Sequence, residues 1–172
     1  MASLTAQQRE QLIAAAFEAR DTAYAPYSKF RVGAALQTTD GQILKGSNIE
    51  NASYGGTICA ERTALVKAVL IDSLNSERQK SFSGLAVVSD VAAAISPCGI
   101  CRQFIREFCE PKMPILLVPA DYSATAKTGE KARCWTRTSK SSYPTVLDLN
   151  TWSYLGNTHR LFTSQLPHSV GL

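Results

Sequence analysis

Three cysteines in two short clusters have the residue types and the spacing of a metal site. Cys59 lies in TICAERTA, and Cys98 and Cys101 lie in SPCGICRQ. Zinc bound by thiolates is normally four-coordinate, and a structural site fills all four positions with protein ligands. Glu61 follows the first cysteine by two residues, and a carboxylate beside an open metal position can serve as general acid and base for an attacking water. The sequence therefore predicts a hydrolytic zinc enzyme.

The alternative is a closed zinc site in a non-catalytic binding module, which needs a fourth protein ligand. The candidates for that ligand are Cys109, Cys134, His159 and His168. Cys109 is the nearest in sequence, but it is expected about two turns further along the same helix than Cys101. A small buried side chain is the better interpretation of Cys109. The open site is favoured because Glu61 and Pro97 complete a known pattern.

The N-termini of two helices and a neighbouring arginine are expected to stabilise the thiolate form of these cysteines. Cys98 and Cys101 are three residues apart, so both sulfurs lie on one face of a helix turn. Both clusters are predicted at helix N-termini, where free amides and the helix dipole favour thiolate over thiol. Arg62 directly follows Glu61 and is predicted to donate hydrogen bonds to the sulfurs and withdraw charge from them. An ordinary surface arginine fits the local sequence equally well.

Length and composition indicate one soluble globular domain. The chain has 172 residues, of which 45% are apolar and 19% charged, an ordinary balance for such a domain. No apolar run approaches the ~20 residues of a membrane span, and residues 1–5 lack the features of a secretory signal, so no membrane association is expected. Five cysteines are better explained by metal than by disulfides, which predicts a cytoplasmic protein.

The net charge of +4 is concentrated near the C-terminus. Residues 1–120 carry 12 basic and 11 acidic side chains, whereas five basic residues lie within 127–140. A surface that holds single-stranded nucleic acid is one interpretation of this segment, but such surfaces interleave aromatic residues for stacking. Trp135 is the one aromatic residue there. A solvated loop is therefore favoured, and nucleic acid is not an expected partner.

The pattern of apolar residues predicts elements in the order α-β-β-α-β-α-β. A capping box of Thr5 and Gln8 begins a helix that ends before Pro26. The further predictions are a strand over 30–38, a turn at Asp40-Gly41, a strand over 43–47, a helix from 58 or 59, a strand over 84–89, a helix from 97 or 98 to 108 and a strand over 114–118. Residues 120–143 are expected as a loop, 145–149 as a strand and 159–166 as a short helix. This order implies helices packed on a mixed sheet.

The chain also resembles a known family. The pattern Cys-x-Glu followed by Pro-Cys-x-x-Cys is that of the zinc deaminases, and within them the chain closely resembles the small homotetrameric cytidine deaminases. The matching stretches are AYAPYSKFRVGAAL (23–36), NIENASYGGTICAERTALVKAV (48–69) and SPCGICRQFIREF (96–108). Together they cover roughly residues 10–118. Asn48-Ile-Glu50 and the Tyr-Ser-x-Phe-x-Val-Gly stretch narrow the resemblance to the nucleoside branch.

The resemblance implies a fold, an activity and an assembly. The fold is a three-layer α-β-α arrangement with a mixed central sheet, in one domain over 1–172 with an insertion at about 120–157. The activity is hydrolytic deamination of cytidine and 2′-deoxycytidine to the uridines with release of ammonia, in pyrimidine salvage. One zinc ion per chain and a homotetramer with active sites at subunit interfaces are also implied.

The resemblance further implies roles for single residues. Cys59, Cys98 and Cys101 hold zinc, while Glu61 takes a proton from the attacking water and delivers protons to N3 and to the departing ammonia. The residues implied in substrate binding are Asn48 and Glu50 for the ribose 3′-hydroxyl, the Ala60 amide for the pyrimidine carbonyl, Phe30 for stacking on the base and Tyr54 for a neighbouring subunit's site. Without the resemblance, Asn48 and Glu50 would be interpreted as a polar strand end and Phe30 as core.

The C-terminus departs from the family pattern. The family ends Leu-Leu-Pro-x-Ser-Phe-Gly-Pro, and its phenylalanine packs over the base in an adjacent subunit's site. Here the run is QLPHSVGL over 165–172, with Val170 in place of that phenylalanine. Valine lacks the aromatic face, whose contact contributes about 1 kcal/mol. Residues 120–157 are also longer than the family norm.

Overall fold

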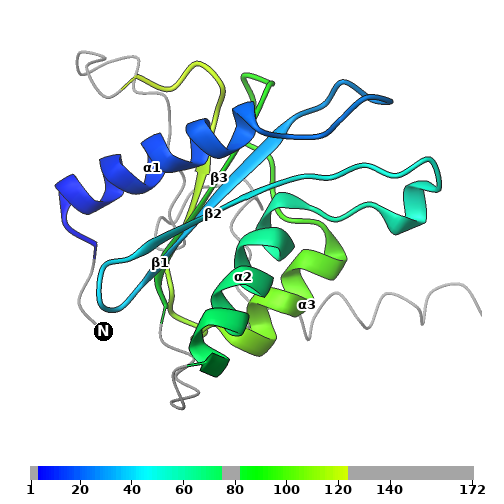
Figure 1. Cartoon of the computed structure of the whole chain (residues 1–172). Coiled ribbons are helices and arrows are strands. Elements are labelled where there is room, and N and C mark those ends of the chain that lie inside the picture. Colours follow the sequence, from blue (N-terminus) through cyan, green and yellow to red (C-terminus); the bar gives the residue numbers. More distant parts are fainter. Residues whose placement is uncertain (1–3, 75–81, 124–172) are drawn as a thin grey trace, which may run out of the picture.

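The computed structural model describes residues 4–74 and 82–123, and within them a mixed sheet lies between two helix layers (Figure 1). The elements are α1 (Ala6–Asp21), β1 (Val32–Thr38), β2 (Ile43–Ser47), α2 (Ala60–Leu74), β3 (Phe82–Ser89), α3 (Gly99–Phe108) and β4 (Ile115–Val118), with a short 3₁₀ helix at Tyr54–Gly56. The strand order is β2-β1-β3-β4. The expected three-layer α/β fold is confirmed.

The strand directions bring several chain segments to one edge of the sheet. β1 runs antiparallel to β2 and to β3, whereas β4 runs parallel to β3. The start of β1 therefore lies beside the ends of the other three strands. Gly33 pairs with Ser47, and Val32 pairs with Ser89. The loops that leave this edge carry the chain into α2 and α3, so residues far apart in sequence meet there.

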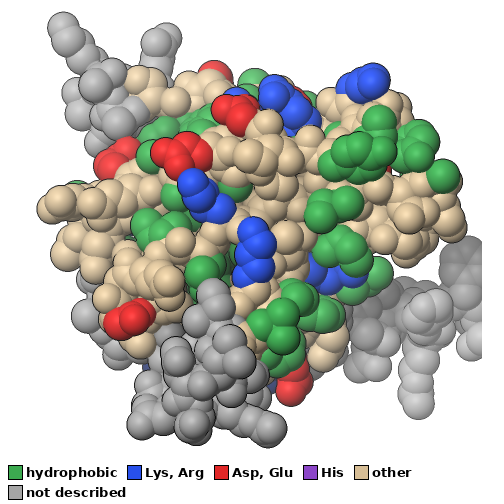
Figure 2. Space-filling view, in the orientation of Figure 1, with side chains coloured by type: hydrophobic (Ala, Val, Ile, Leu, Met, Phe, Trp, Pro, Cys, Tyr) green, Lys and Arg blue, Asp and Glu red, His purple; other side chains and the backbone are tan. Residues whose placement is uncertain are grey.

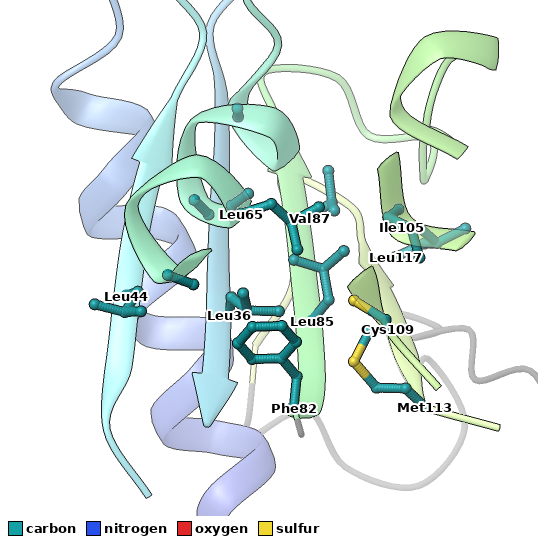
Figure 3. Packing of buried hydrophobic residues seen from close by; sticks show 14 residues of the cluster. Leu36, Leu44, Leu65, Phe82, Leu85, Val87, Ile105, Cys109, Met113 and Leu117 are labelled. Atoms are coloured by element: carbon teal, nitrogen blue, oxygen red, sulfur yellow. The ribbon is translucent and has the colours of Figure 1, made fainter. Parts of the chain in front are cut away.

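Each helix layer has its own buried apolar cluster. Leu12, Ile13 and Ala16 of α1 pack on one sheet face. α2 and α3 cover the other face, where Figure 3 shows Leu36, Leu65 and Leu85 in the interior. The full set of buried residues in this second cluster is Ala34, Leu36, Leu44, Ala60, Ala64, Leu65, Ala68, Phe82, Leu85, Val87, Ile105, Cys109, Met113 and Leu117. Successive residues of β1 point to opposite faces of the sheet, so this strand contributes side chains to both clusters.

Two glycines allow the helices to approach the sheet closely. A Cβ atom on Gly33 would lie 2.1 Å from the carbonyl oxygen of Ala16 in α1, and one on Gly46 would lie 2.4 Å from that of Ala60 in α2. Any larger residue would push the helix away from the strand. Gly46 therefore determines how close the start of α2 lies to β2.

The predicted elements are confirmed, with shifted boundaries. The capping box of Thr5 and Gln8 is present. β1 begins at residue 32 rather than 30, because side chains bind the backbone just before it: Asn48 binds the Phe30 carbonyl and Asp90 binds the Arg31 N–H. β3 begins two residues earlier than expected and β4 one residue later.

The two helices after the strands begin later than predicted. Ile58 exchanges two backbone hydrogen bonds with Ile49 and is therefore extended, so α2 begins at Ala60 instead of 58 or 59. Cys98 is the N-cap of α3, whose first residue is Gly99. No helix in the described ranges has the length and apolar character of a membrane span.

Several predictions lie outside the described residues. They concern the basic segment 127–140, the strand over 145–149, the helix over 159–166, and Cys134, His159, His168 and Val170. Most of the expected insertion at 120–157 lies there as well.

Candidate active site

The three cysteines of the sequence pattern converge at one point. Cys59 Sγ lies 3.7 Å from Cys98 Sγ, and the sulfurs of Cys59, Cys98 and Cys101 all lie within 4.8 Å of one another. Zinc–sulfur bonds of about 2.3 Å in a tetrahedron place sulfurs about 3.8 Å apart. The donor set and its spacing therefore fit zinc. Within residues 4–74 and 82–123, the structure brings together no other group of three or more side chains that could bind a metal.

The three sulfurs are positioned by the first residues of two helices. Cys59 directly precedes α2, Cys98 caps α3, and Cys101 lies in the first turn of α3. The two helices pack against each other on the same sheet face. The Arg102 side chain donates through Nε to the Pro97 carbonyl at 2.9 Å, which holds the turn before Cys98. Thiolates at helix N-termini are stabilised by the free amides and the helix dipole.

Glu61 is a buried carboxyl group in the first turn of α2. It is 4% exposed, and burial raises its pKa to about 6, with the nearby Cys59 thiolate adding to the effect. Desolvation disfavours the charged carboxylate, so the group gains and loses a proton close to neutral pH. A carboxyl group with this property, two residues from a metal ligand, is suited to moving protons during catalysis.

Arg62 lies against the metal-binding cysteines. Its Nη2 donates to the Thr57 carbonyl at 2.9 Å and to Cys59 Sγ at 3.6 Å. The pKa of Cys59 falls to about 5, first because the Cys101 thiol donates to it and then because Arg62 does. The structure thus places the guanidinium where a charge-withdrawing role requires it. Its role in tuning the metal stays a prediction.

Asn48 and Glu50 directly follow the end of β2, and both side chains are nearly buried. Asn48 is 7% exposed and Glu50 9%. The Glu50 carboxylate accepts hydrogen bonds from the Tyr27 and Ser28 backbone N–H groups, at 2.9 and 3.2 Å, and from the Ser28 hydroxyl. These contacts, the hydroxyl first, hold the pKa of Glu50 below its usual range. A carboxylate has about four acceptor positions, so one remains for a ligand hydroxyl.

The other three predicted substrate residues differ in exposure. Phe30 lies in the loop before β1 and is 37% exposed, so it is not a core residue. Tyr54 is 61% exposed and meets Tyr27 edge-to-face, with ring centroids 6.0 Å apart. Ala60 is buried as the first residue of α2, and the N–H groups of a first helix turn lack intrahelical partners.

Sequence reasoning missed two groups that hold the site. Ser28 joins two predicted substrate residues, because its hydroxyl binds Glu50 and accepts from the Phe30 N–H at 3.0 Å. The serine was visible only as part of a family stretch. Asp90 binds Arg31, 59 residues earlier, and no local pattern could reveal that contact. Cys109, in contrast, lies in the core beside Met113 as predicted (Figure 3), and burial raises its pKa to about 12.

Comparisons with known proteins agree with this geometry. Residues 6–117 match the family model described as the cytidine and deoxycytidylate deaminase zinc-binding region. A cytidine deaminase of Sporosarcina psychrophila is 55% identical over 63% of this chain and 75% of its own length. A probable cytidine deaminase of Dictyostelium discoideum is 52% identical over 59% of this chain and 66% of its own.

A solved structure supports the same assignment. The crystal structure of a cytidine deaminase from Burkholderia pseudomallei superimposes with a TM-score of 0.58 at 46% identity, covering 66% of this chain and 84% of that one. The residues that match the family model, 6–117, include both cysteine clusters and Glu61. This chain belongs to the cytidine and deoxycytidylate deaminase family.

Proposed function

We propose that this protein is a zinc-dependent cytidine deaminase that converts cytidine and 2′-deoxycytidine to uridine and 2′-deoxyuridine with release of ammonia. The observation that carries the proposal is Glu61, a buried carboxyl group with a pKa of about 6 beside three converging cysteines. Family membership points to the same activity. Zinc held by Cys59, Cys98 and Cys101 supplies Lewis-acid activation of water.

Glu61 carries the proton transfers. Deamination requires that a water lose one proton as it attacks C4 and that the resulting hydroxyl lose the second as the C4 carbonyl forms, while N3 of the pyrimidine and the departing amino group each gain one proton. A single carboxyl group that titrates near neutral pH can accept each of these protons in turn and deliver it onward. Burial of Glu61 excludes bulk water, which would otherwise exchange these protons.

The groups around Glu61 position a nucleoside. The Ala60 amide, at the start of α2, is free to donate to the pyrimidine carbonyl. Asn48 and Glu50 bind the ribose 3′-hydroxyl, and Phe30 stacks on the base. The ionised Glu50 accepts a hydroxyl but repels a phosphate in the same region. Free nucleosides are therefore favoured over nucleotides, and nucleic acid is not a partner.

The protein is further proposed to form a homotetramer with active sites at subunit interfaces. Large apolar side chains are exposed on the loops from α1 to β1 and from β2 to α2, where Figure 2 shows them gathered. They are Tyr24, Tyr27, Phe30, Ile49, Tyr54 and Ile58. Surface of this kind is typical of interfaces. The exposure of Tyr54 supports the proposal that this residue reaches a neighbouring subunit's site. We also propose a single domain over the whole chain, a cytoplasmic location and a role in pyrimidine salvage.

An absorbance assay with zinc-loaded protein tests the activity. We expect rapid loss of cytidine absorbance, and much slower turnover of cytidine 5′-monophosphate and of a cytosine-containing oligonucleotide. Absence of turnover on free cytidine would contradict the proposed function. Faster turnover of the oligonucleotide would instead support polynucleotide editing.

Subunit mixing tests the shared sites. A Glu61→Gln chain lacks the proton carrier, and a Tyr54→Ala chain lacks the residue offered to its neighbour. If Tyr54 acts in the adjacent site, mixed tetramers regain sites in which both groups are present. Recovered activity on mixing, with a tetramer mass by light scattering, is expected. A fully active monomer would contradict the interface proposal.

A further inference from the structure

Asn48 is held in one orientation by the backbone at the start of β1. Its Nδ2 donates to the Phe30 carbonyl at 2.9 Å, and its Oδ1 accepts from the Val32 N–H at 2.8 Å. Rotating the amide by half a turn would place donor against donor and acceptor against acceptor, so the orientation is determined. One N–H and one acceptor position then remain for a ligand. Their direction depends on where the backbone of residues 30–32 lies.

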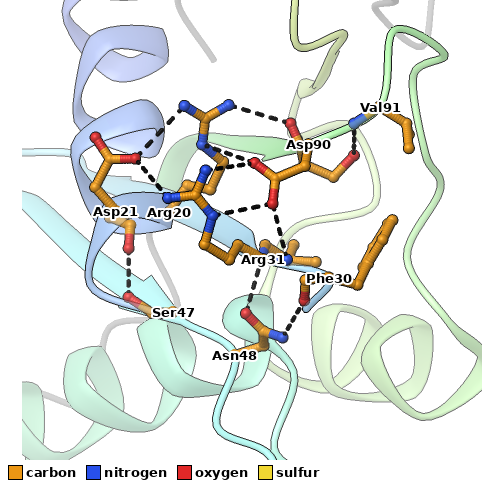
Figure 4. Close-up of polar contacts among 11 residues, drawn as sticks. Arg20, Asp21, Phe30, Arg31, Ser47, Asn48, Asp90 and Val91 are labelled. Carbon is orange, nitrogen blue, oxygen red and sulfur yellow. Dashed lines mark hydrogen bonds and ion pairs between the residues drawn. The ribbon is translucent and has the colours of Figure 1, made fainter. Parts of the chain in front are cut away.

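That backbone is anchored from the opposite side by Asp90. Arg31, between the two residues that Asn48 binds, donates to Asp90 Oδ2 through its backbone N–H at 3.1 Å and through Nε at 3.0 Å. Its Nη2 donates to Asp90 Oδ1 at 2.9 Å. Figure 4 shows Arg31 between Asp90 and Asn48. Val32 and Ser89 are the last paired residues of β1 and β3, so the Arg31–Asp90 contact continues the pairing by one step.

The contact is a bidentate, charge-assisted pair at the protein surface, where the Arg31 side chain is 43% exposed. The Asp90 side chain is 27% exposed, and Arg20 Nε approaches its Oδ1 at 3.6 Å. Hydrogen bonding by Arg31 holds the pKa of Asp90 below its usual range. Bidentate arginine–carboxylate pairs are geometrically demanding as well as strong. Asp21, by comparison, contacts Arg31 only through Nη1 at 3.4 Å, and its side chain is 62% exposed.

We propose that Asp90 is a positioning residue for nucleoside binding, which acts through Arg31 on the orientation of Asn48. It touches neither the zinc ligands nor Glu61 in the described contacts, so it acts on recognition of the sugar rather than on proton transfer. The proposal rests on the assignment of Asn48 to the ribose 3′-hydroxyl. Loss of Asp90 therefore weakens the preference for a substrate that carries this hydroxyl.

The test compares cytidine with 3′-deoxycytidine as substrates of zinc-loaded protein. Wild type is expected to prefer cytidine in kcat/KM, and Asn48→Ala to lose much of that preference. Asp90→Ala is expected to lower the preference roughly threefold to tenfold through KM, with kcat within about twofold of wild type. Asp90→Asn keeps an acceptor for the Arg31 N–H and is expected to lie between the two. In an Asn48→Ala background, Asp90→Ala should reduce the preference little further, because both changes remove the same contact.

Asp21→Asn is the matched control. It removes another carboxylate that contacts Arg31 but leaves the backbone of residues 30–32 bound to Asp90. We expect an unchanged preference for cytidine over 3′-deoxycytidine. If Asn48→Ala lowers the preference and neither Asp90 variant does, the positioning role is wrong while the nucleoside site stands. If Asn48→Ala leaves the preference intact, the assignment of Asn48 is wrong and the positioning role fails with it. A loss in kcat alone, with equal effects on both substrates, would also overturn the proposal.

Discussion

Cys59 Sγ and Cys98 Sγ lie 3.7 Å apart although 39 residues separate them in the chain. Each stands at the start of a helix, and both helices pack on one face of the sheet. The separation of the sulfurs equals the edge of a zinc–thiolate tetrahedron to within about 0.1 Å. The packing of α2 on α3 therefore forms the metal site.

Removal of zinc is expected to make the Cys98 thiol reactive and to leave the Cys109 thiol unreactive. Cys98 is exposed in the described structure, whereas Cys109 is 5% exposed and burial raises its pKa to about 12. A chelator should make Cys98 react with iodoacetamide, while Cys109 stays unmodified until the protein unfolds. Peptide mapping by mass spectrometry measures both. Equal labelling of Cys98 with and without chelator would show that it does not hold the metal.

Glu61→Gln is expected to lose activity while keeping the metal. The amide is nearly isosteric but cannot accept and deliver a proton, so kcat should fall roughly 10²- to 10⁴-fold. Zinc content and the thermal unfolding midpoint should remain near those of wild type. Glu18→Gln, on an exposed side chain of α1, is the control and should leave kcat unchanged. Substantial turnover by Glu61→Gln would contradict its role in proton transfer.

Arg62→Gln is expected to weaken the metal site without abolishing it. The guanidinium donates to Cys59 Sγ and helps to lower the pKa of that thiol. Loss of its charge should reduce zinc affinity or kcat by roughly 10- to 100-fold, as is usual for groups that bind metal ligands. Competition with a coloured chelator measures the affinity. Arg106→Gln, at an exposed position of α3, should behave as wild type; an unaltered Arg62→Gln protein would support the surface-arginine interpretation.

Gly46→Ala is expected to displace the start of α2. The added Cβ would lie 2.4 Å from both the Ala60 carbonyl oxygen and the Ala64 nitrogen, so the helix must move away from β2. Overpacking of this kind costs about 1–3 kcal/mol of unfolding free energy, and zinc content should fall because Cys59 moves with the helix. Gly55→Ala has open space around its Cβ and should change neither. Calorimetry and metal analysis of both variants make the comparison.

Ser28→Ala is expected to give a stability loss that depends on pH. The Ser28 hydroxyl is the largest cause of the lowered pKa of Glu50. A carboxyl group whose folded pKa is depressed stabilises the fold above its unfolded pKa of about 4.3, and this contribution disappears as the pH falls through the folded value. The difference in unfolding free energy from wild type should therefore be widest at neutral pH and narrow below about pH 4.

Urea denaturation across this pH range checks the effect, with Ser47→Ala as the control. The Ser47 hydroxyl also makes two hydrogen bonds, to the Ala19 carbonyl and the Thr22 hydroxyl, but touches no carboxylate. Its variant should show a difference that does not depend on pH. A constant difference for Ser28→Ala would mean that the hydroxyl does not stabilise ionised Glu50.

Local patterns were sufficient for the elements of this fold and for the chemical groups of its site. The capping box of Thr5 and Gln8, the Asp40-Gly41 turn and the apolar strands identify helices and strands because each depends on neighbours within a few residues. Boundaries shifted where distant groups bind the backbone. β1 begins at Val32 because Asn48 and Asp90 occupy the backbone groups of Phe30 and Arg31.

The sequence by itself identified the family and predicted the metal ligands and the acid/base carboxylate, because cysteine and glutamate spacing within a helix turn is a local property. Only the tertiary structure decided the environment of these groups. Burial by the packed helices raises the pKa of Glu61, and the sheet edge brings Ser28 to Glu50 and Asp90 to Arg31 across 22 and 59 residues. Such contacts depend on strand order and register, which no short stretch of sequence encodes.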